Sequence, residues 1–534
     1  MRADTKTALA EIVALDGSDL WDRELELSKA MEASGESPAE ELEELKVLHV
    51  AALLRLQLYD AALAEADSLC SSGDAAIARA AACAGLQRFS EARRELASIS
   101  PEESSALCGD DIAGFEEHVS RLETQSQGTL SAEDLVKGTG CGTPALLPPL
   151  AEYVGGVETA AVASGGRRGL RVTRATEPGQ LLLCSRALVR TGSSRASRGG
   201  LRSQTSVEAA VGAYRRAAEL SPRAARVLGV ALSSGTAEDA IVPVEWLSWQ
   251  GSREPAASRG VPSDEVLAGV HETNSFTEAG VESVYPAVSL ANHSCAPSCL
   301  LLKVGNAQIL RACRRLEAGT EVTIAYFDTL RPLGEREQRC RSWGFVCACP
   351  RCQFERGIPP KELYMSLCVL PQMACAPIIA VPDAQAFSVD SLALDELEAA
   401  VRKHTLDDLK AHWLRASFVG IYKSRAEAGS QEAQELFVQV LEATVPGFFF
   451  HCRQLVALWK LHAGGAEASK LGRGASKEEH RAWRWCLAAH KLRYGKLSSS
   501  DLNRVMQETM RSVENHRDEF CRASRRTDPG EVRK

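Results

Sequence analysis

Three kinds of hydrophobic pattern follow one another along the chain. Residues 20–126 are rich in Ala, Leu and Glu and predict helices. Short β-type runs follow at 169–189, around the turn signal EPG, and again at 300–326, where a Gly-Asn turn and a Gly turn separate the strands. From residue 357 the pattern is mostly helical again. We therefore expect an α+β multidomain protein, with helical regions on both sides of a mostly β centre.

The first helical region contains an internal repeat. The segment at 51–69 reads AALLRLQLYDAALAEADSL and matches AACAGLQRFSEARRELASI at 81–99. Each copy predicts a helix, a tight turn and a second helix, in which a small Ala lets the helices approach and an aromatic ring fills the gap. The matched pairs are Leu56/Leu86, Gln57/Gln87, Tyr59/Phe89, Ala62/Ala92 and Glu65/Glu95. The pattern resembles a tetratricopeptide repeat, shortened from its usual period of roughly 34 residues. The alternative is an ordinary helical bundle with a chance match. Because two copies are few, helices near 21–33 and 112–124 are expected to cap the repeat.

Changes in composition suggest the domain boundaries. Residues 127–165 hold Gly, Pro and small residues and predict a linker. A Ser/Arg/Gly-rich stretch opens a helical insert at about 191–270. The expected order is helical repeats (1–126), linker (127–165), a mostly β domain containing the insert (166–330), a cysteine-rich segment (331–356) and a C-terminal helical domain (357–534).

Composition and charge narrow the class of protein. The chain has 534 residues, a formal net charge of −8, and 45% hydrophobic and 25% charged residues. Several globular domains are expected, and the acidic balance argues against a dedicated nucleic-acid binder while remaining compatible with basic protein substrates. No signal peptide and no apolar run long enough to cross a bilayer are seen, so we expect no membrane association and a place in the cytoplasm, the nucleus or both.

The cysteines predict a metal site. The chain has 17 of them, an odd number, which favours free thiols in a reducing compartment over a disulfide framework. Cys347, Cys349 and Cys352 form C-x-C-x-x-C and supply three corners of a tetrahedral zinc site. Cys295 or Cys299 would be the fourth ligand, and such a closed site would be structural. The alternatives are unrelated buried thiols, or a nucleophilic Cys295 beside Asn292 and His293; the latter is weaker because sequence neighbours seldom face each other.

Four motifs in order carry a family resemblance. GRRGLRVTRATEPGQLLL (166–183) is followed by NSFTEAGVESVYPAVSLANHSCAPSC (274–299), EVTIAYFD (321–328) and GFVCACPRC (344–352). Together they resemble the SET-domain protein lysine methyltransferases, of the SET-and-MYND type, over roughly residues 165–356. The resemblance implies a SET domain at 166–330 and a zinc-binding post-SET segment at 331–356. A tetratricopeptide-like segment before the SET domain also occurs in some relatives of this type.

The resemblance also implies a cofactor, S-adenosyl-L-methionine, and a role for each matching residue. Asn292 would hold the cofactor through its side chain and His293 largely through its backbone, while Phe345 would stack on the adenine. Tyr326 would be the catalytic tyrosine at the methyl-transfer channel. The residues implied at the cofactor are Arg168, Gly169, Asn274, Asn292, His293, Tyr326 and Phe345. The implied ligands of a structural Zn²⁺ are Cys295, Cys347, Cys349 and Cys352.

These residue types suit methyl transfer to lysine. A lysine amine has a pKa of ~10.4, so it is protonated and not nucleophilic at neutral pH. A narrow apolar channel beside a positive sulfonium would lower that pKa. Alignment of the amine with the methyl group would supply most of the catalysis. The competing interpretation of Tyr326 is an ordinary core aromatic next to a strand.

The sequence departs from the family pattern in three places. The usual Gly-x-Gly reads Arg167-Arg168-Gly169, where added bulk would weaken cofactor binding. The residue pair after NHSC-Ala is Pro297-Ser298 instead of Pro-Asn, which removes an amide. Residues 185–294 contain no cysteine, so the MYND zinc finger is missing.

Two functions of different classes follow. The first is a protein-lysine N-methyltransferase acting on a histone or non-histone protein, with further protein partners bound by the helical repeats. The second is a non-enzymatic adaptor that keeps a degenerate SET domain as a scaffold, which the altered glycine motif and Ser298 favour. The intact Asn292, His293, Tyr326 and Phe345 favour the enzyme. A DNA-binding zinc protein is disfavoured by the acidic charge and the compact cysteine cluster.

Overall fold

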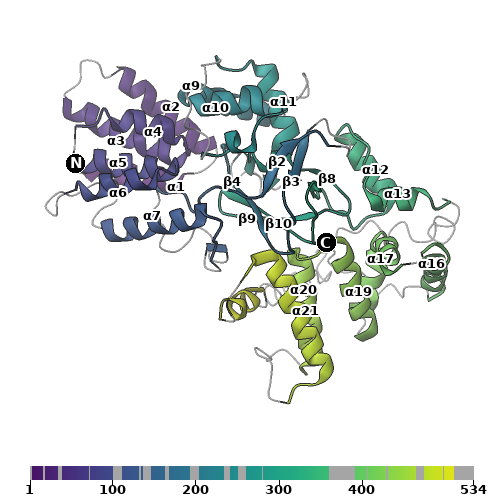
Figure 1. Cartoon of the computed structure of the whole chain (residues 1–534). Coiled ribbons are helices and arrows are strands. Elements are labelled where there is room, and N and C mark those ends of the chain that lie inside the picture. The colour runs from purple at the N-terminus through teal and green to yellow at the C-terminus, as the bar shows by residue number, and fades with distance from the viewer. Residues whose placement is uncertain are drawn as a thin grey trace, which may run out of the picture.

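The computed structural model places helices at both ends of the chain around central β-sheets (Figure 1). This arrangement confirms the α+β multidomain class. The structure describes the following residues: 3–15, 18–33, 39–70, 72–99, 107, 111–131, 134–135, 146–162, 168–192, 204–233, 241–249, 260–278, 281–359, 391–405, 407–427, 431–464, 474–496, 498, 500–509 and 511. Gly166, Arg167 and the stretch 193–203 of the predicted insert lie outside them.

The N-terminal region is helical, as predicted. Its helices are α1 (Ala3–Ala14), α2 (Ser18–Ala33), α3 (Ala39–Arg55), α4 (Tyr59–Ala66), α5 (Ser72–Gly85), α6 (Phe89–Ala97) and α7 (Ile112–Ser126). The 30-residue repeat is visible in the backbone, because Gln57 and Gln87 occupy the same place between paired helices and have φ angles of 63° and 60°. Ala62 and Ala92 are fully buried, which permits the close helix approach that the sequence indicated. The resemblance to tetratricopeptide repeats remains a prediction.

Three small sheets form the centre. One has the order β1-β4-β10-β9, the second β2-β3-β11-β8, and the third β5-β7-β6. All pairings are antiparallel except that of β8 with β11. The strands are β1 (Tyr153–Val154), β2 (Val157–Ala160), β3 (Gly169–Val172), β4 (Leu181–Arg186), β5 (Val189–Thr191), β6 (Ser275–Glu278), β7 (Val281–Val284), β8 (Asn292–His293), β9 (Cys299–Val304), β10 (Ala307–Ala312) and β11 (Glu321–Ile324).

The predicted linker differs from the structure at residues 153–160. These residues form β1 and β2, which pair with β4 and β3. The expectation of a linker is therefore wrong for this stretch. The surrounding Gly and Pro residues indicated a loop, and the two strands are too short to show an alternation of hydrophobic and polar residues.

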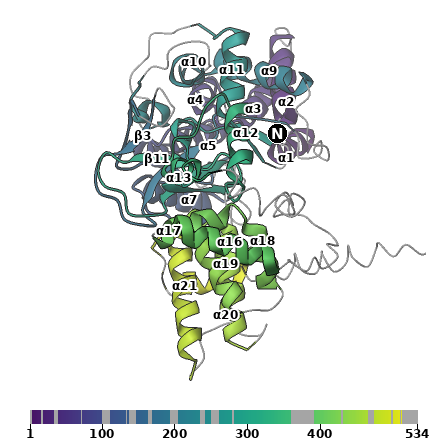
Figure 2. The same ribbon diagram turned by 90° about the vertical axis from the view of Figure 1, so that its right-hand side faces the viewer.

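Helices follow in the insert and after the sheets. The insert contains α9 (Gln204–Leu220), α10 (Pro222–Arg226), the π-helix η2 (Val227–Ala231), the 3-10 helix η3 (Val244–Leu247) and α11 (Asp264–Asn274). A short 3-10 helix, η5 (Val288–Leu290), precedes β8. Later helices are α12 (Leu333–Ser342), α13 (Pro350–Arg356), α16 (Ser391–His404), α17 (Asp408–Ala416), α18 (Val419–Glu427), α19 (Gln431–Thr444), α20 (Phe449–His462) and α21 (Lys477–Tyr494). In Figure 2 the helices α16 to α21 lie below the sheets.

Buried polar contacts join the N-terminal helices to the insert. The Glu24 carboxylate on α2 is fully buried and accepts hydrogen bonds from Arg216 on α9 over 2.8 and 2.9 Å. The same carboxylate lies 3.1 Å from Nε2 of His49 on α3. Because a buried carboxylate is costly unless it is paired, this contact requires the two regions to pack together.

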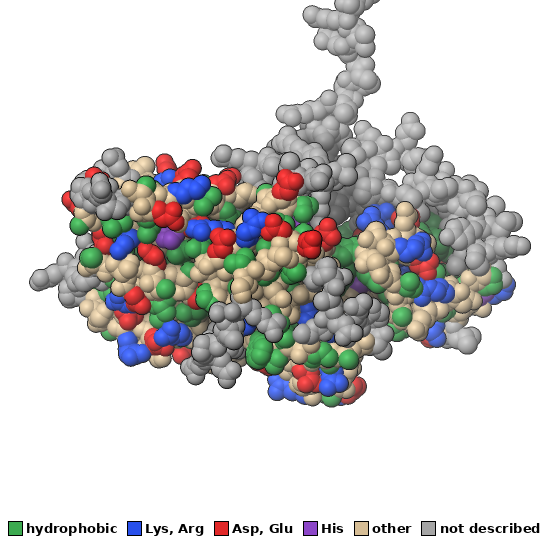
Figure 3. Space-filling view, turned by 90° about the horizontal axis from the view of Figure 1, so that it is seen from above, with side chains coloured by type: hydrophobic (Ala, Val, Ile, Leu, Met, Phe, Trp, Pro, Cys, Tyr) green, Lys and Arg blue, Asp and Glu red, His purple; other side chains and the backbone are tan. Residues whose placement is uncertain are grey.

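The distribution of charged side chains on the visible face is consistent with the small net charge of the chain. The face seen in Figure 3 mixes acidic and basic side chains, without a field of one sign. No helix within the described ranges has both the length and the apolar character needed to pass through a bilayer.

Candidate functional site

The NHSC segment and the tyrosine segment lie side by side. β8 runs parallel to β11, with Asn292 opposite Thr323 and His293 opposite Ile324. Tyr326 comes two residues after the end of β11, so it lies beside the strand rather than in it. Parallel pairing of these short strands brings together residues that are more than 30 positions apart in the sequence.

Asn292 joins β8 to the first SET-like strand. Its amide nitrogen donates hydrogen bonds to the backbone oxygen of Arg168 over 3.0 Å and to Oε1 of Glu321 over 2.9 Å. A Cβ at Gly169 would lie 2.6 Å from that nitrogen and 2.8 Å from a methyl of Val162. Glycine at 169 is therefore what allows Asn292 to approach. Both amide hydrogens are used, and Oδ1 is the atom of this amide that can accept from a ligand.

His293 lies between Tyr326 and the cysteines. The backbone N–H of Tyr326 donates to Nδ1 over 3.1 Å, and Nε2 lies 3.3 Å from Sγ of Cys295. Because Nδ1 accepts, the hydrogen of the neutral ring is on Nε2, which donates to the cysteine sulfur. The ring also stacks on Phe327, with centroids 4.5 Å apart and an angle of 25° between the planes.

Tyr326 is fixed by a hydrogen bond and by neighbouring rings. Its hydroxyl donates to the backbone oxygen of Ala291 over 2.9 Å. Ring centroids of Trp343 and Phe345 lie 5.3 and 6.2 Å from its own. Burial, followed by the negative charge of Glu321, raises the pKa of Tyr326 above its usual value. The hydroxyl therefore keeps its proton at neutral pH, and its oxygen can still accept a hydrogen bond.

Four cysteines form a compact group. One sulfur from each of Cys295, Cys347, Cys349 and Cys352 lies within 4.8 Å of the others, and all four residues are buried. Sulfurs that bind one tetrahedral zinc at about 2.3 Å lie about 3.8 Å apart, so the group fits this metal. A cation bound by the four sulfurs would displace their protons. Cys299, the other candidate ligand, lies in β9 and outside the group.

Arginines support the cysteine group from behind. Arg336 donates to Sγ of Cys352 over 3.0 Å and also pairs with the buried Glu355. Arg351 donates to the backbone oxygens of Cys295 and Thr329 over 3.4 and 2.9 Å, and to the hydroxyl of Ser417 over 2.9 Å. Because Ser417 directly follows α17, these contacts tie the cysteine segment to the C-terminal helices.

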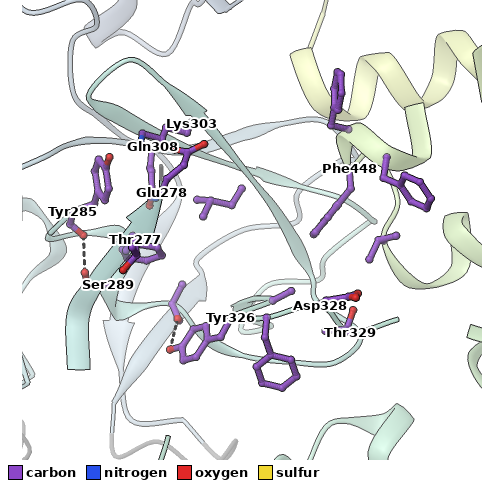
Figure 4. Close-up of a pocket in the computed structure, with 18 of the residues that line it drawn as sticks. Thr277, Glu278, Tyr285, Ser289, Lys303, Gln308, Tyr326, Asp328, Thr329 and Phe448 are labelled. Carbon is purple, nitrogen blue, oxygen red and sulfur yellow. Dashed lines mark hydrogen bonds and ion pairs between the residues drawn. The ribbon is translucent and has the colours of Figure 1, made fainter. Parts of the chain in front are cut away.

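A cavity of about 1060 Å³ opens next to Tyr326. Its walls come from β6, the segment after β11, and the start of α20, which contributes Phe449 and Phe450 after Phe448 (Figure 4). Trp343 also lines it and is 43% exposed. In Figure 4 the Tyr326 hydroxyl lies at the base of the cavity, with Tyr285 and Ser289 on one side and Phe448 on another.

Asn274 lies at this cavity, apart from the Asn292 contacts. Its amide nitrogen donates to the backbone oxygens of Ser233 and Val270 over 2.7 and 2.9 Å and approaches the hydroxyl of Thr273 at 2.7 Å. The amide thus closes the end of α11, and among the described residues it makes no hydrogen bond to Asn292. The structure brings the other predicted residues (Arg168, Gly169, Asn292, His293, Tyr326 and Phe345) into one connected set.

Several residues at the site were not singled out in the sequence analysis. Trp343 and Phe327 pack against Tyr326 and His293, and Glu321 holds Asn292. Cys340 is buried in the same cluster as the four grouped cysteines but is not one of the four. Cys340 lies on α12, three residues before Trp343, and it is not part of the C-x-C-x-x-C spacing that marked the other cysteines.

With this geometry established, comparison with known proteins decides the domain type. The central region matches the SET domain model. The match covers residues 167–327, from two residues before β3 to the aromatic residue after Tyr326. It therefore includes Arg168, Gly169, Asn274, Asn292, His293 and Tyr326, and ends before the C-x-C-x-x-C cluster.

Similar curated proteins are named as lysine methyltransferases. The chain is 29% identical over 177 residues to histone-lysine N-methyltransferase SMYD3 of Mus musculus, which covers 32% of this chain and 35% of the relative. It is 35% identical over 80 residues to N-lysine methyltransferase SMYD2-B of Xenopus laevis (15% and 19%), and 37% identical over 75 residues to protein-lysine N-methyltransferase SMYD4 of Homo sapiens (14% and 9%). The chain thus matches about a third or less of the length of these relatives.

Proposed function

We propose that this protein is an S-adenosylmethionine-dependent protein-lysine N-methyltransferase. The observation that carries the proposal is the position of Tyr326, whose hydroxyl faces a large cavity while its backbone is fixed by His293. The SET match and the relatives named as lysine methyltransferases support the same activity. The substrate would be a lysine side chain of another protein.

The cofactor would lie against Gly169, Asn292, His293 and Phe345. Oδ1 of Asn292 is available to accept a hydrogen bond, and the half-buried Phe345 ring offers a face for stacking. When bound, S-adenosylmethionine would supply an electrophilic methyl group. Arg168 takes part through its backbone oxygen, which holds the Asn292 amide in place. Asn274 would act from the cavity side, through its own Oδ1.

Tyr326 and its aromatic neighbours would prepare the lysine. Trp343, Phe327 and Tyr326 line the cavity together, and these apolar rings would disfavour an ammonium ion, so the amine would release its proton to water before reacting. The Tyr326 hydroxyl already donates to Ala291, which directs its lone pairs to accept from the amine N–H. Positioning of this kind can supply several kcal/mol, on the order of 7 or more, of the barrier reduction.

Zinc would hold the post-SET segment against the site. Cys295 belongs to the NHSC segment and the other three ligands to the C-x-C-x-x-C segment, so one ion would connect both. Four thiolates leave no open coordination position, and the metal would therefore be structural. Through Phe345, two residues before Cys347, the ion would also fix one wall of the cofactor site.

The remaining assignments belong to the same proposal. Residues 1–126 would be tetratricopeptide-like and bind protein partners, residues 331–356 would be the post-SET segment, and residues 357–534 a helical domain. The chain would lack a MYND finger and would work in the cytoplasm, the nucleus or both. Neither nucleic acid nor membrane is proposed as a direct partner.

The adaptor hypothesis has one observation in its favour. The nitrogen of Asn292 is already committed to Arg168 and Glu321, and the sequence has Arg167 where the family pattern has its first glycine. If this arrangement closed the cofactor site, the domain would survive as a scaffold.

Calorimetric titration with S-adenosylmethionine separates the two hypotheses. The wild type is expected to bind in the micromolar range or tighter, corresponding to about −8 kcal/mol. Asn292→Ala should lose most of the affinity and Tyr326→Phe should keep it. Absence of binding by the zinc-loaded wild type would contradict the enzyme and favour the adaptor.

A further inference from the structure

The charges lining the cavity next to Tyr326 are unequal. Two acidic residues among the described lining residues are each paired with a cation of the same wall. Glu278 forms an ion pair with Lys303, and Asp328 accepts from Arg331 over 3.1 Å. These two pairs leave no excess of charge on the SET side of the cavity.

The C-terminal helices add two cations to the cavity lining, and no carboxylate of the described residues is paired with them. Arg453 on α20 and Arg493 on α21 both line the cavity. Within the described ranges, neither guanidinium lies within 4.0 Å of a carboxylate, in contrast to Lys303 and Arg331. The described lining therefore carries two more positive than negative side chains, although the whole chain has a net charge of −8.

Aromatic rings hold both guanidinium groups at the cavity wall. Arg493 lies 5.5 Å from the ring centre of Phe449 and 5.5 Å from that of Tyr494. Arg453 lies 5.9 Å from the ring centre of Phe450. Each guanidinium is half-buried, so it has lost part of its hydration without gaining an ion pair. Such a site gains free energy when an anion arrives.

We infer that this cavity selects lysine-containing segments that carry an acidic group on the part that reaches α20 and α21. This inference rests on the proposed function and names its substrate class. The group would be a carboxylate or a phosphate, because a guanidinium binds both by paired hydrogen bonds. A segment with several Lys or Arg residues around the target would place like charges against Arg453 and Arg493. The cavity thus disfavours tails that are uniformly basic, and specificity would come from this repulsion as much as from attraction.

Peptide binding to the full chain tests the inference without requiring catalysis. Three fluorescein-labelled peptides share one lysine in a Ser/Ala/Gly frame and carry Glu, Ser or Arg at the flanking positions. Fluorescence anisotropy at low salt should show the Glu peptide binding about fivefold or more tighter than the Arg peptide, as expected for one or two partly buried ion pairs. A peptide with phosphoserine in place of Glu distinguishes a phosphate from a carboxylate. Comparing peptides with a free and an amidated C-terminus distinguishes a terminal carboxylate from a side-chain carboxylate.

Charge reversal identifies the residues responsible. The double variant Arg453→Glu/Arg493→Glu should invert the preference in favour of the Arg peptide. The neutral double variant Arg453→Gln/Arg493→Gln should remove the preference for the Glu peptide. It provides the same test if the charge-reversal variant does not fold. Arg484→Glu is the matched control, since Arg484 is exposed on α21 and lies outside the cavity lining; it should keep the wild-type ratio.

The outcomes separate the inference from the proposed function. Equal or tighter binding of the Arg peptide by the wild type, or a ratio unmoved in the Gln pair, overturns the inference even if methyl transfer occurs. A preference for the Glu peptide without methyl transfer to any lysine supports the binding inference and contradicts the proposed activity. The preference should also weaken as salt is raised from 50 to about 500 mM, because screening acts on partly exposed pairs.

Discussion

The imidazole of His293 connects the backbone of Tyr326 to the sulfur of Cys295. Nδ1 accepts from the Tyr326 N–H over 3.1 Å, and Nε2 lies 3.3 Å from the Cys295 sulfur. One side chain therefore couples the cysteine group to the residue proposed to position the substrate amine. A change that disrupts the metal site should therefore also displace Tyr326, and a change that displaces Tyr326 should also disrupt the metal site.

Replacing His293 should affect both the position of Tyr326 and the cysteine group. His293→Ala removes the acceptor for the Tyr326 N–H and leaves a partly buried donor without this partner, which costs up to about 1–3 kcal/mol. We expect the methyl-transfer rate to fall about tenfold or more. Steady-state kinetics with saturating cofactor would measure the loss in kcat. His480→Ala, an exposed change at the start of α21, is the control; equal kinetics for His293→Ala and wild type would contradict the connection.

The cysteine group should contain about one zinc per chain. Cys349→Ser and Cys352→Ser each remove one of four ligands, so the bound zinc should fall far below one equivalent. Elemental analysis of the purified protein checks this directly. Cys70→Ser, at an exposed free cysteine, should retain the metal. A full equivalent of zinc in both ligand variants would exclude the site. Chelator treatment of the wild type should likewise lower cofactor affinity, since Phe345 lies next to the cysteine segment.

A methyl group at position 169 should weaken cofactor binding. The Cβ of Gly169→Ala would lie 2.6 Å from the Asn292 nitrogen and 2.8 Å from Val162, so Asn292 must move. We expect about a tenfold or greater loss of S-adenosylmethionine affinity by calorimetry, equal to ~1.4 kcal/mol. The control is Gly212→Ala, whose Cβ would meet nothing within 4 Å on helix α9. Similar affinities in the two variants would place the cofactor elsewhere.

The contact between Glu24 and Arg216 should make stability depend on acid pH. Burial raises the pKa of Glu24, but hydrogen bonds from His49 and Arg216 outweigh it, and the net pKa lies below the ordinary 4.5. A lowered carboxyl pKa in the folded state stabilises the protein above the unfolded-state value, and this contribution is lost as pH falls from about 4.5 through the folded-state pKa. At neutral pH, Glu24→Gln removes the buried carboxylate from Arg216, which then keeps, of its described ion-pair partners, only the more exposed Glu219 at 3.5 Å, and should cost about 3 kcal/mol.

Urea unfolding at pH 7 and pH 4 would test that dependence. The difference between wild type and Glu24→Gln should be large at pH 7 and smaller at pH 4. Glu26→Gln, on the same helix but exposed, should show little difference at either pH. A Glu24→Gln effect that does not change between the two pH values would show that packing, not charge, holds α2 to α9.

Much of the fold could be predicted because its signals are local. The helix pairs around Gln57 and Gln87 repeat in sequence and therefore in backbone, and the strands around residues 169–189 and 299–312 are bounded by turn residues. The strands at 153–160 were missed because two to four residues show no periodicity, and their partners supply the reason for extension. Residues 153–160 are extended because they pair with distant strands, and such pairing cannot be seen in a single sequence.

At the site, too, some residues could be predicted from the sequence and others only from contacts in the folded chain. The family resemblance pointed to Asn292 and Tyr326, and the C-x-C-x-x-C spacing pointed to three of the four grouped cysteines. Trp343, Glu321 and Arg336 act by contacts made across the fold, and nothing in their local sequence marks them. The commitment of the Asn274 amide to the end of its own helix also appears only in the folded chain.

Mass spectrometry of methyl transfer tests the central claim most directly. The zinc-loaded protein is incubated with S-adenosylmethionine and a lysine-containing protein substrate, beside Tyr326→Phe and the matched control Tyr153→Phe in β1. We predict methyl-lysine in the wild type and control and at least a hundredfold less, about 2.7 kcal/mol in the barrier, with Tyr326→Phe. Cofactor affinity should remain unchanged in all three. Equal methylation by Tyr326→Phe, or none by a wild type that binds the cofactor, would contradict the account.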